Sequence, residues 1–194
     1  MQLNLEELKG MSINERQKSI QDNVLESSYS VMFLALVEEI GEYVASLGYP
    51  DWKKVKRDEE NMKIELADIA IFAMNCEYYD SKSITKPAYN AGHLGFKSDL
   101  SFVDQLLRMV VECEFNQIPS FIISNRPEIS RLIEGKQALN IIRRYYGYDK
   151  GHYTKMYGDV EDNKVMLDLV DKNVPELFNA IAIEAAKYQR IQFA

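Results

Sequence analysis

Residues 31–54 read VMFLALVEEIGEYVASLGYPDWKK, and this stretch decides the fold class. Residues 31–37 are all apolar, which in a helix favours burial on every side. Glu38, Glu39 and Glu42 follow directly. Because an unpaired buried charge is strongly unfavourable, these carboxylates predict either a narrow opening to water or a positively charged partner.

Composition and charge exclude several classes of protein. With 194 residues, of which 46% are hydrophobic, the chain can bury a full core, and we expect one domain over residues 1–194. The net charge of -7 argues against broad binding to nucleic acid or an anionic membrane surface. Cys76 and Cys113 form no disulfide framework or zinc pattern, and every apolar run is shorter than the roughly 20 residues that span a bilayer. We therefore expect a cytoplasmic protein with no nucleic-acid or membrane partner.

Helical patterns follow one another along the chain, without convincing strand alternation. Ser12 and Glu15 form a capping-box pattern, Gly48 is placed to end a helix, and Pro127 suits a first helical turn. Ser101 with Asp104 opens another helix. The predicted helices are 12–26, 29–47, 61–79, one that starts at 101, 127–146, and a C-terminal segment with a break near Pro175.

Two segments are predicted as loops. Residues 81–99 contain glycine, proline and asparagine and form a loop or insert. Residues 147–163 are the second loop. The fold class is all-α.

The acids recur at matching spacing in two of the predicted helices. Glu39 and Glu42 are three residues apart, and Glu65 and Asp68 repeat this spacing inside the apolar segment IELADIAIFAM. Four like charges from two packed helices would repel one another. Hard divalent cations prefer oxygen ligands, and Mg²⁺ commonly combines a few carboxylates with substrate phosphates. The pattern therefore predicts a Mg²⁺ site.

A solvated surface and a di-iron site each fit part of this pattern. A glutamate pair at the edge of an apolar helix is usually a solvated surface, but a surface does not account readily for the repeated spacing. A di-iron bundle needs Glu-x-x-His on its helices. Neither His93 nor His152 has a glutamate three residues before it, and both histidines lie in glycine-containing loops where exposure is expected.

A second concentration of polar chemistry lies in residues 135–163, GKQALNIIRRYYGYDKGHYTKMYGDVEDN. Lys136, Asn140 and Arg143 are spaced to share one helix face, where they present two cations and an amide to a single ligand. Lysine and arginine on a helix are usually solvent-facing. The glycines and tyrosines of the following loop strengthen a phosphate site, because tyrosine hydroxyls hydrogen-bond phosphate oxygens.

The motifs EEIGE, DWKK, ELADIAIF and KQALNIIRRYYGYDKGHYTKMYGDVEDN together resemble the all-α dimeric dUTPase family of the MazG-like nucleotide pyrophosphatase superfamily. The resemblance covers about half of the chain. It implies a helical bundle of the all-α NTP pyrophosphatase type and a homodimer. It also implies Mg²⁺-dependent hydrolysis of dUTP to dUMP and pyrophosphate.

The resemblance also assigns residues to roles. The metal ligands or water activators would be Glu39, Glu42, Glu65 and Asp68, with Glu38 a further acid of the motif. The phosphate contacts would be Lys136, Arg143, Tyr148 and Lys155, while Asn140 and Asn163 would position the nucleotide. The remaining substrate-binding residues are Gln21, Trp52, Phe72, Asn75 and Tyr153.

The base preference stays open. Phe72 lies one helical turn after Asp68, where its ring can stack on a nucleobase, but stacking does not distinguish bases. Side-chain amides satisfy uracil or cytosine by flipping, so Gln17, Gln21 and Asn75 are alternatives. A dCTP-preferring or broader pyrophosphatase is one alternative function, and a non-catalytic helical nucleotide-binding module is another.

Overall fold

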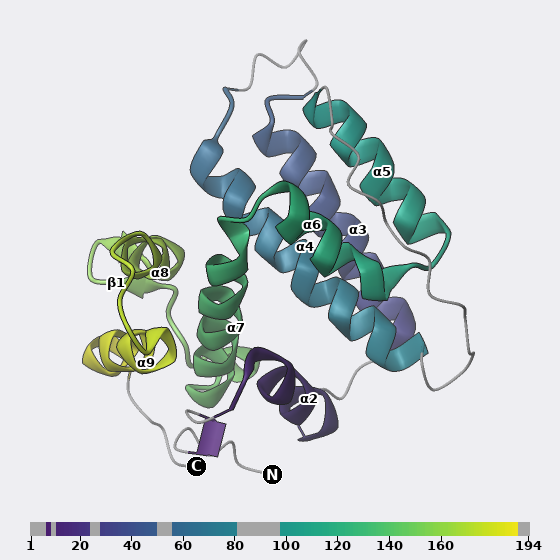
Figure 1. Ribbon diagram of the computed structural model, residues 1–194. Coiled ribbons are helices and arrows are strands. Elements are labelled where there is room, and N and C mark those ends of the chain that lie inside the picture. The colour runs from purple at the N-terminus through teal and green to yellow at the C-terminus, as the bar shows by residue number, and fades with distance from the viewer. Residues whose placement is uncertain (1–6, 9–10, 24–27, 50–55, 81–97, 190–194) are drawn as a thin grey trace. The chain divides into compact units, whose positions relative to one another are not determined.

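The computed structural model describes residues 7–8, 11–23, 28–49, 56–80 and 98–189 (Figure 1). The chain forms two compact units. The central unit is Glu26–Ser130, and the terminal unit combines Met1–Leu25 with Arg131–Ala194. The single domain over residues 1–194 stays a prediction.

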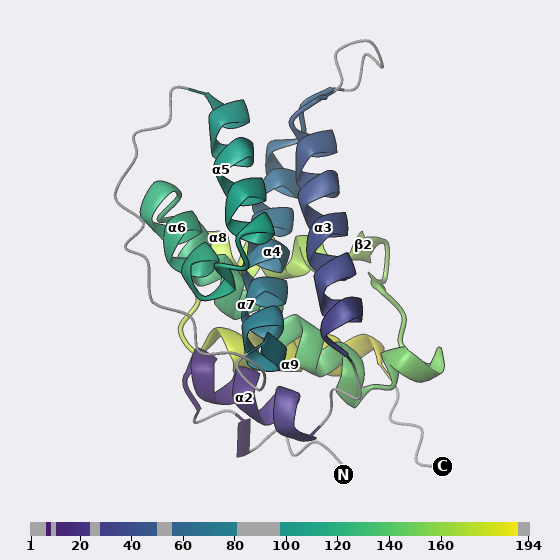
Figure 2. The ribbon, with the colours of Figure 1, turned by 90° about the vertical axis from the view of Figure 1, so that its right-hand side faces the viewer.

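Each regular element in the described part of the central unit is helical. Its elements are α3 (Tyr29–Ser46), α4 (Glu59–Asp80), α5 (Asp99–Val111), the 3₁₀ turn η2 (Phe115–Gln117), α6 (Ile118–Asn125) and the start of α7 (Ile129–Tyr145). Helix α3 packs along α4, and η2 and α6 also pack against α4 (Figures 1 and 2). The core between them contains Leu36, Ile40, Ile69, Phe102, Leu106, Phe121 and Ile122.

Helix α3 has the predicted ends. Ser28 is its N-cap and accepts the Val31 N–H, and Gly48 follows the helix with a φ of 87°. The expected burial on every side is wrong. Val31, Leu34 and Val37 are 54%, 66% and 42% exposed, because these positions lie on one stripe of the helix and the described part of the central unit covers the opposite stripe.

Two helices of the central unit differ from the predictions. Helix α5 starts earlier than predicted, because Ser98 is the N-cap and Ser101 is the third helical residue of its capping box. Helix α6 has no counterpart among the predicted helices; proline stands in its first turn, and Phe121 and Ile122 are buried. Helix α4 confirms the predicted segment 61–79. The predicted insert lies largely outside the described residues, which resume at Ser98.

The terminal unit combines helices with a small hairpin. Its elements are α2 (Ile13–Asn23), most of α7, the 3₁₀ turn η3 (Tyr148–Lys150), β1 (Met156–Tyr157), β2 (Val160–Glu161), α8 (Asp162–Asp171) and α9 (Leu177–Tyr188). Its core contains Leu132, Leu139, Ile142, Met166, Phe178 and Ile181. The structure confirms the all-α fold class, to which the antiparallel hairpin is a minor addition.

The predicted capping box of α2 is present. Glu15 accepts the Ser12 N–H at 2.8 Å, and the Ser12 hydroxyl accepts the Glu15 N–H at 3.4 Å. The predicted end near residue 26 lies outside the described residues. At the other end of the chain, the predicted break is confirmed, because Pro175 lies between α8 and α9. The loop prediction for residues 147–163 is wrong at its end, since Asp162 opens α8.

Helix α7 approaches α8 and α9 closely at Gly135. A Cβ atom added there would lie 3.1 Å from a methyl of Val170, and 3.2 Å from side-chain carbons of Leu177 and Met166. Glycine permits this contact because it carries no side chain. The turn before Lys136 is therefore held directly against the other two helices.

The described helices include none with both the length and the apolar character needed to cross a membrane.

Candidate active site

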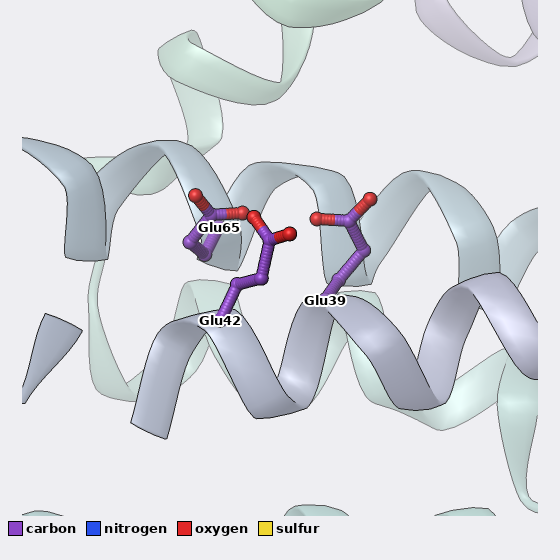
Figure 3. A group of neighbouring side chains, drawn as sticks. All are labelled: Glu39, Glu42 and Glu65. Atoms are coloured by element: carbon purple, nitrogen blue, oxygen red, sulfur yellow. The ribbon is translucent and has the colours of Figure 1, made fainter. Parts of the chain in front are cut away.

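Three glutamates from two packed helices form an acid cluster in the central unit. Glu39 and Glu42 lie one turn apart on α3, and Glu65 faces them from α4 (Figure 3). One carboxylate oxygen from each of the three lies within 4.8 Å of the others. The predicted three-residue spacing therefore brings acids of both helices together.

The acid cluster changes the protonation of Glu39. Burial, the nearby charge of Asp68 and a hydrogen bond with Glu65 together raise the pKa of Glu39 to about 9. The charge of Glu42 acts in the same direction. In the absence of a cation, Glu39 therefore keeps its proton at neutral pH, which removes one of the repelling charges.

Asp68 and Glu38 lie at the edge of this arrangement. Asp68 is buried on α4 and acts on Glu39 through its charge, but its oxygens are not part of the group of three. Glu38 is exposed on α3. The structure thus brings three of the four predicted metal ligands into direct proximity and places the fourth within electrostatic reach.

The acid cluster fits a hard divalent cation. It offers only oxygen ligands, from one exposed, one half-buried and one buried carboxylate. A cation would relieve the repulsion among the acids, which adds to burial in keeping Glu39 protonated. Glu39, Glu42 and Glu65 would hold it, with Asp68 close to them.

The residues predicted to meet the base lie in both units. Phe72 is half-buried and Asn75 is buried on α4 of the central unit. Gln17 and Gln21 are buried on α2 of the terminal unit, where Gln17 accepts a hydrogen bond from Gln137 at 2.9 Å. Trp52 lies outside the described residues. Which amide reads the base stays a prediction.

A cationic cluster occupies α7 and the start of α8 in the terminal unit. The Lys136 ammonium donates to Asn163 Oδ1 at 3.0 Å, and Arg143 Nη2 donates to the same oxygen at 3.2 Å. Arg143 Nη1 is 3.5 Å from Asn140 Oδ1. The predicted face of α7 therefore directs two cations toward one amide oxygen.

Asp162 also belongs to this cluster, although it is not among the site residues predicted from the sequence. Its carboxylate accepts Arg143 Nε at 2.9 Å and Arg143 Nη2 at 2.7 Å, which is a bidentate ion pair. It also accepts the Tyr153 hydroxyl at 2.8 Å. The sequence offers only an indirect signal, the place of Asp162 beside Asn163 in EDN (residues 161–163), because the buried arginine that requires a carboxylate partner is visible only in the structure.

The predicted substrate contacts in the loop after α7 differ in their exposure to solvent. Tyr148 and Lys155 are exposed, and the Lys155 ammonium lies 5.7 Å from the centre of the Tyr148 ring. Tyr153 is buried, with its hydroxyl bonded to Asp162 and Tyr157. His152 is exposed, as predicted, and His93 lies outside the described residues.

Comparison with known protein families finds a family model that matches most of the chain. The family model described as dUTPase matches residues 7–148, a span that includes the acid cluster, Lys136 and Arg143. Tyr153, Lys155 and Asn163 lie beyond the matched span. The comparison with curated proteins finds no match. Since the family model covers most of the chain, the chain belongs to the all-α dUTPase family and is a dUTP diphosphatase, an enzyme that hydrolyses dUTP.

Proposed function

We propose that this enzyme converts dUTP to dUMP and pyrophosphate with Mg²⁺ as its cofactor. The acid cluster carries the proposal, because three carboxylates from α3 and α4 bring oxygens within 4.8 Å of one another. The raised pKa of Glu39, about 9, supports it, because after burial the repulsion from neighbouring acids contributes to that shift, and a cation would offset this repulsion. Divalent metal ions are generally used by dUTPases.

The carboxylates hold the ion and handle the proton of the attacking water. Glu39, Glu42 and Glu65 would hold Mg²⁺, with Asp68 beside them. When bound, the ion neutralises the triphosphate and lowers the pKa of water. One of the acids then accepts the proton that the water loses.

The cationic cluster binds the phosphates. Arg143 and Lys136 stabilise the charge that develops on phosphoryl oxygens. Asn140 and Asn163 position the nucleotide. Asn163 accepts hydrogen bonds from both cations, and Asn140 Oδ1 lies 3.5 Å from Arg143 Nη1. Tyr148 and Lys155 add contacts from the exposed loop.

Base selection is assigned to Phe72 and a side-chain amide. The Phe72 ring stacks on the base without distinguishing uracil from cytosine. Gln21 supplies the hydrogen bonds that distinguish the two, and Asn75 and Gln17 are the alternatives. A dCTP-preferring or broader enzyme is the competing assignment.

We also propose a homodimer in the cytoplasm. The exposed stripe of Val31, Leu34 and Val37 on α3 supports a partner surface. Cys76 and Cys113 form no disulfide with each other, which suits a reducing compartment. Microscopy of a fluorescent fusion tests the location.

The decisive experiment measures products. Purified protein is incubated with dUTP, dCTP, dTTP or UTP, with Mg²⁺ or with a chelator, and nucleotide and pyrophosphate are quantified. Equal amounts of dUMP and pyrophosphate, produced only with the ion and fastest from dUTP, are expected. Release of inorganic phosphate would contradict the cleavage position, and no turnover would leave a binding module.

A variant pair links turnover to the acid cluster. Glu65→Gln removes a charge from the cluster at almost constant volume and should abolish most activity. Glu60→Gln is the matched control, because Glu60 is exposed on the same helix. Normal turnover by the Glu65 variant would refute the metal site.

A further inference from the structure

Asp162 is the least exposed acidic side chain among the residues that the structure describes, at 1% exposure. It lies in the first turn of α8, directly after the hairpin. A buried carboxylate is tolerated only when donors surround it. The identity of these donors indicates what Asp162 does.

Both side-chain donors to Asp162 belong to the predicted substrate-binding set. The guanidinium of Arg143 donates twice, and the Tyr153 hydroxyl donates once. The backbone N–H of Asp162 donates to the Lys155 carbonyl at 2.7 Å. One residue thus connects α7 with the loop that precedes the hairpin.

A second tyrosine extends this connection. The Tyr153 and Tyr157 hydroxyls are 2.6 Å apart. Because Tyr153 donates its proton to Asp162, Tyr157 donates to Tyr153. Burial raises the pKa of Tyr157 to about 12 and also raises the pKa of Tyr153, so both hydroxyls stay protonated donors at physiological pH.

This chain of hydrogen bonds fixes the plane of the guanidinium. A bidentate carboxylate holds the Nε–Nη2 edge of Arg143, and the Tyr153 bond holds the carboxylate in turn. Asn163, the next residue of α8, accepts Arg143 and Lys136 together. An arginine fixed in this way loses less side-chain entropy when it binds a phosphate.

The geometry points to Asp162 as a positioning residue for dUTP binding: it holds the Arg143 guanidinium ready for the triphosphate. This inference rests on the proposed role of Arg143. It concerns binding of the substrate, so it predicts a change in KM more than in kcat.

The first test is Asp162→Asn, which keeps the volume and removes the charge. KM for dUTP should rise roughly 10- to 100-fold, the range for loss of a group that orients a ligand-binding side chain. Mg²⁺ binding to the protein without nucleotide should not change. The matched control is Asp168→Asn, which breaks an exposed ion pair with Lys172 on the same helix and should leave KM unchanged.

The second test asks whether Asp162 acts through Arg143. In an Arg143→Ala background, Asp162→Asn should cause little further loss of kcat/KM, because the side chain it positions is already absent. A purely structural role would instead multiply the two losses. Multiplied losses, or a KM for Asp162→Asn within twofold of wild type, would overturn the inference.

Milder variants keep the inference testable if Asp162→Asn does not fold. Tyr153→Phe removes one hydrogen bond to Asp162, and Tyr157→Phe acts one step farther away. The rise in KM should be larger for Tyr153→Phe, and a wild-type KM for that variant would overturn the inference. Absence of dUTP turnover by the wild-type protein would refute the proposed function instead, so the two failures are distinguishable.

Discussion

Glu39 on α3 and Glu65 on α4 share a hydrogen bond, although both side chains are carboxylic acids. One of them must carry a proton to donate, and the raised pKa assigns that proton to Glu39. The protonation of this pair therefore couples the stability of the central unit to pH and to cations.

Stability without a cation should fall as pH rises. The folded-state pKa of Glu39, about 9, lies above the ordinary carboxyl value of 4.5, so between these limits only the unfolded chain has released the proton. Glu39→Gln cannot ionise and should flatten the decrease. Melting temperatures measured in chelator from pH 5 to pH 9 check this, with Glu60→Gln as the control. Parallel curves for wild type and Glu39→Gln would contradict it.

Mg²⁺ binding should release protons. At pH 7 the ion must displace the proton of Glu39, so the apparent affinity should increase with pH, by at most about tenfold per unit, until pH approaches 9. Calorimetry in two buffers with different ionisation enthalpies counts the protons. We expect close to one proton for the wild type and a smaller number for Glu39→Gln; equal numbers would place the proton elsewhere.

Arg143 and Arg144 should differ sharply. Arg143 is buried against Asp162, whereas Arg144 is half-buried and points about 100° around α7. Arg143→Ala should raise KM for dUTP at least about tenfold, and Arg144→Ala less than about twofold, as expected for a charge outside the site. Steady-state kinetics decides, and equal losses would mean that the wrong face of α7 is assigned to the phosphates.

Phe72 should contribute to nucleotide binding. Phe72→Ala should raise KM for dUTP about fivefold or more, since stacking on an aromatic ring contributes roughly 1–3 kcal/mol. Phe72→Leu separates this role from packing, because it keeps much of the volume without a flat face. A stable Leu variant with a wild-type KM would assign the ring to the core.

Gln21 should influence the choice of base. Gln21→Ala should lower the ratio of kcat/KM for dUTP to that for dCTP, because the amide supplies hydrogen bonds that distinguish the two bases. Asn75→Ala is the comparison. An unchanged ratio in the Gln21 variant together with a lowered ratio in the Asn75 variant would transfer the role to α4.

Dimerisation should depend on the exposed stripe of α3. Leu34→Glu places a charge in its centre and should give a monomer by light scattering at micromolar concentration, while wild type gives a dimer. Ile183→Glu is the control, because Ile183 is a similarly exposed apolar residue in the terminal unit. A monomeric wild type would remove the dimer from the proposal.

Local signals in the sequence are sufficient to predict much of the central unit. Gly48 ends α3 as expected, because left-handed backbone after a helix favours glycine. The matching spacing of two acid pairs, Glu39 with Glu42 and Glu65 with Asp68, predicts an acid cluster, because helical periodicity determines which side chains share a face. Three of these four acids form the cluster. These features depend on residues within one or two turns.

The wrong or missing predictions concern features that depend mainly on contacts between distant parts of the chain. Leu34 is exposed although it belongs to the apolar run of α3. The sequence pattern does not indicate which faces of a helix its neighbours cover. Asp162 does not stand out in the sequence, because its role depends on Arg143, 19 residues earlier, and on Tyr153 across the hairpin. The start of α5 is predicted at Ser101 although Ser98 is the cap, since both serines suit that position.

The close contact at Gly135 has a consequence for sequence variation among relatives. An added methyl group would lie 3.1 Å from Val170 and 3.2 Å from Leu177 and Met166, so a larger residue in α7 requires these side chains to shift or to become smaller. Alanine at this position should therefore co-vary with a smaller residue at 170 or 177. Lys136, a proposed phosphate contact, follows directly, so we expect a change of Gly135 alone to shift the Lys136 side chain.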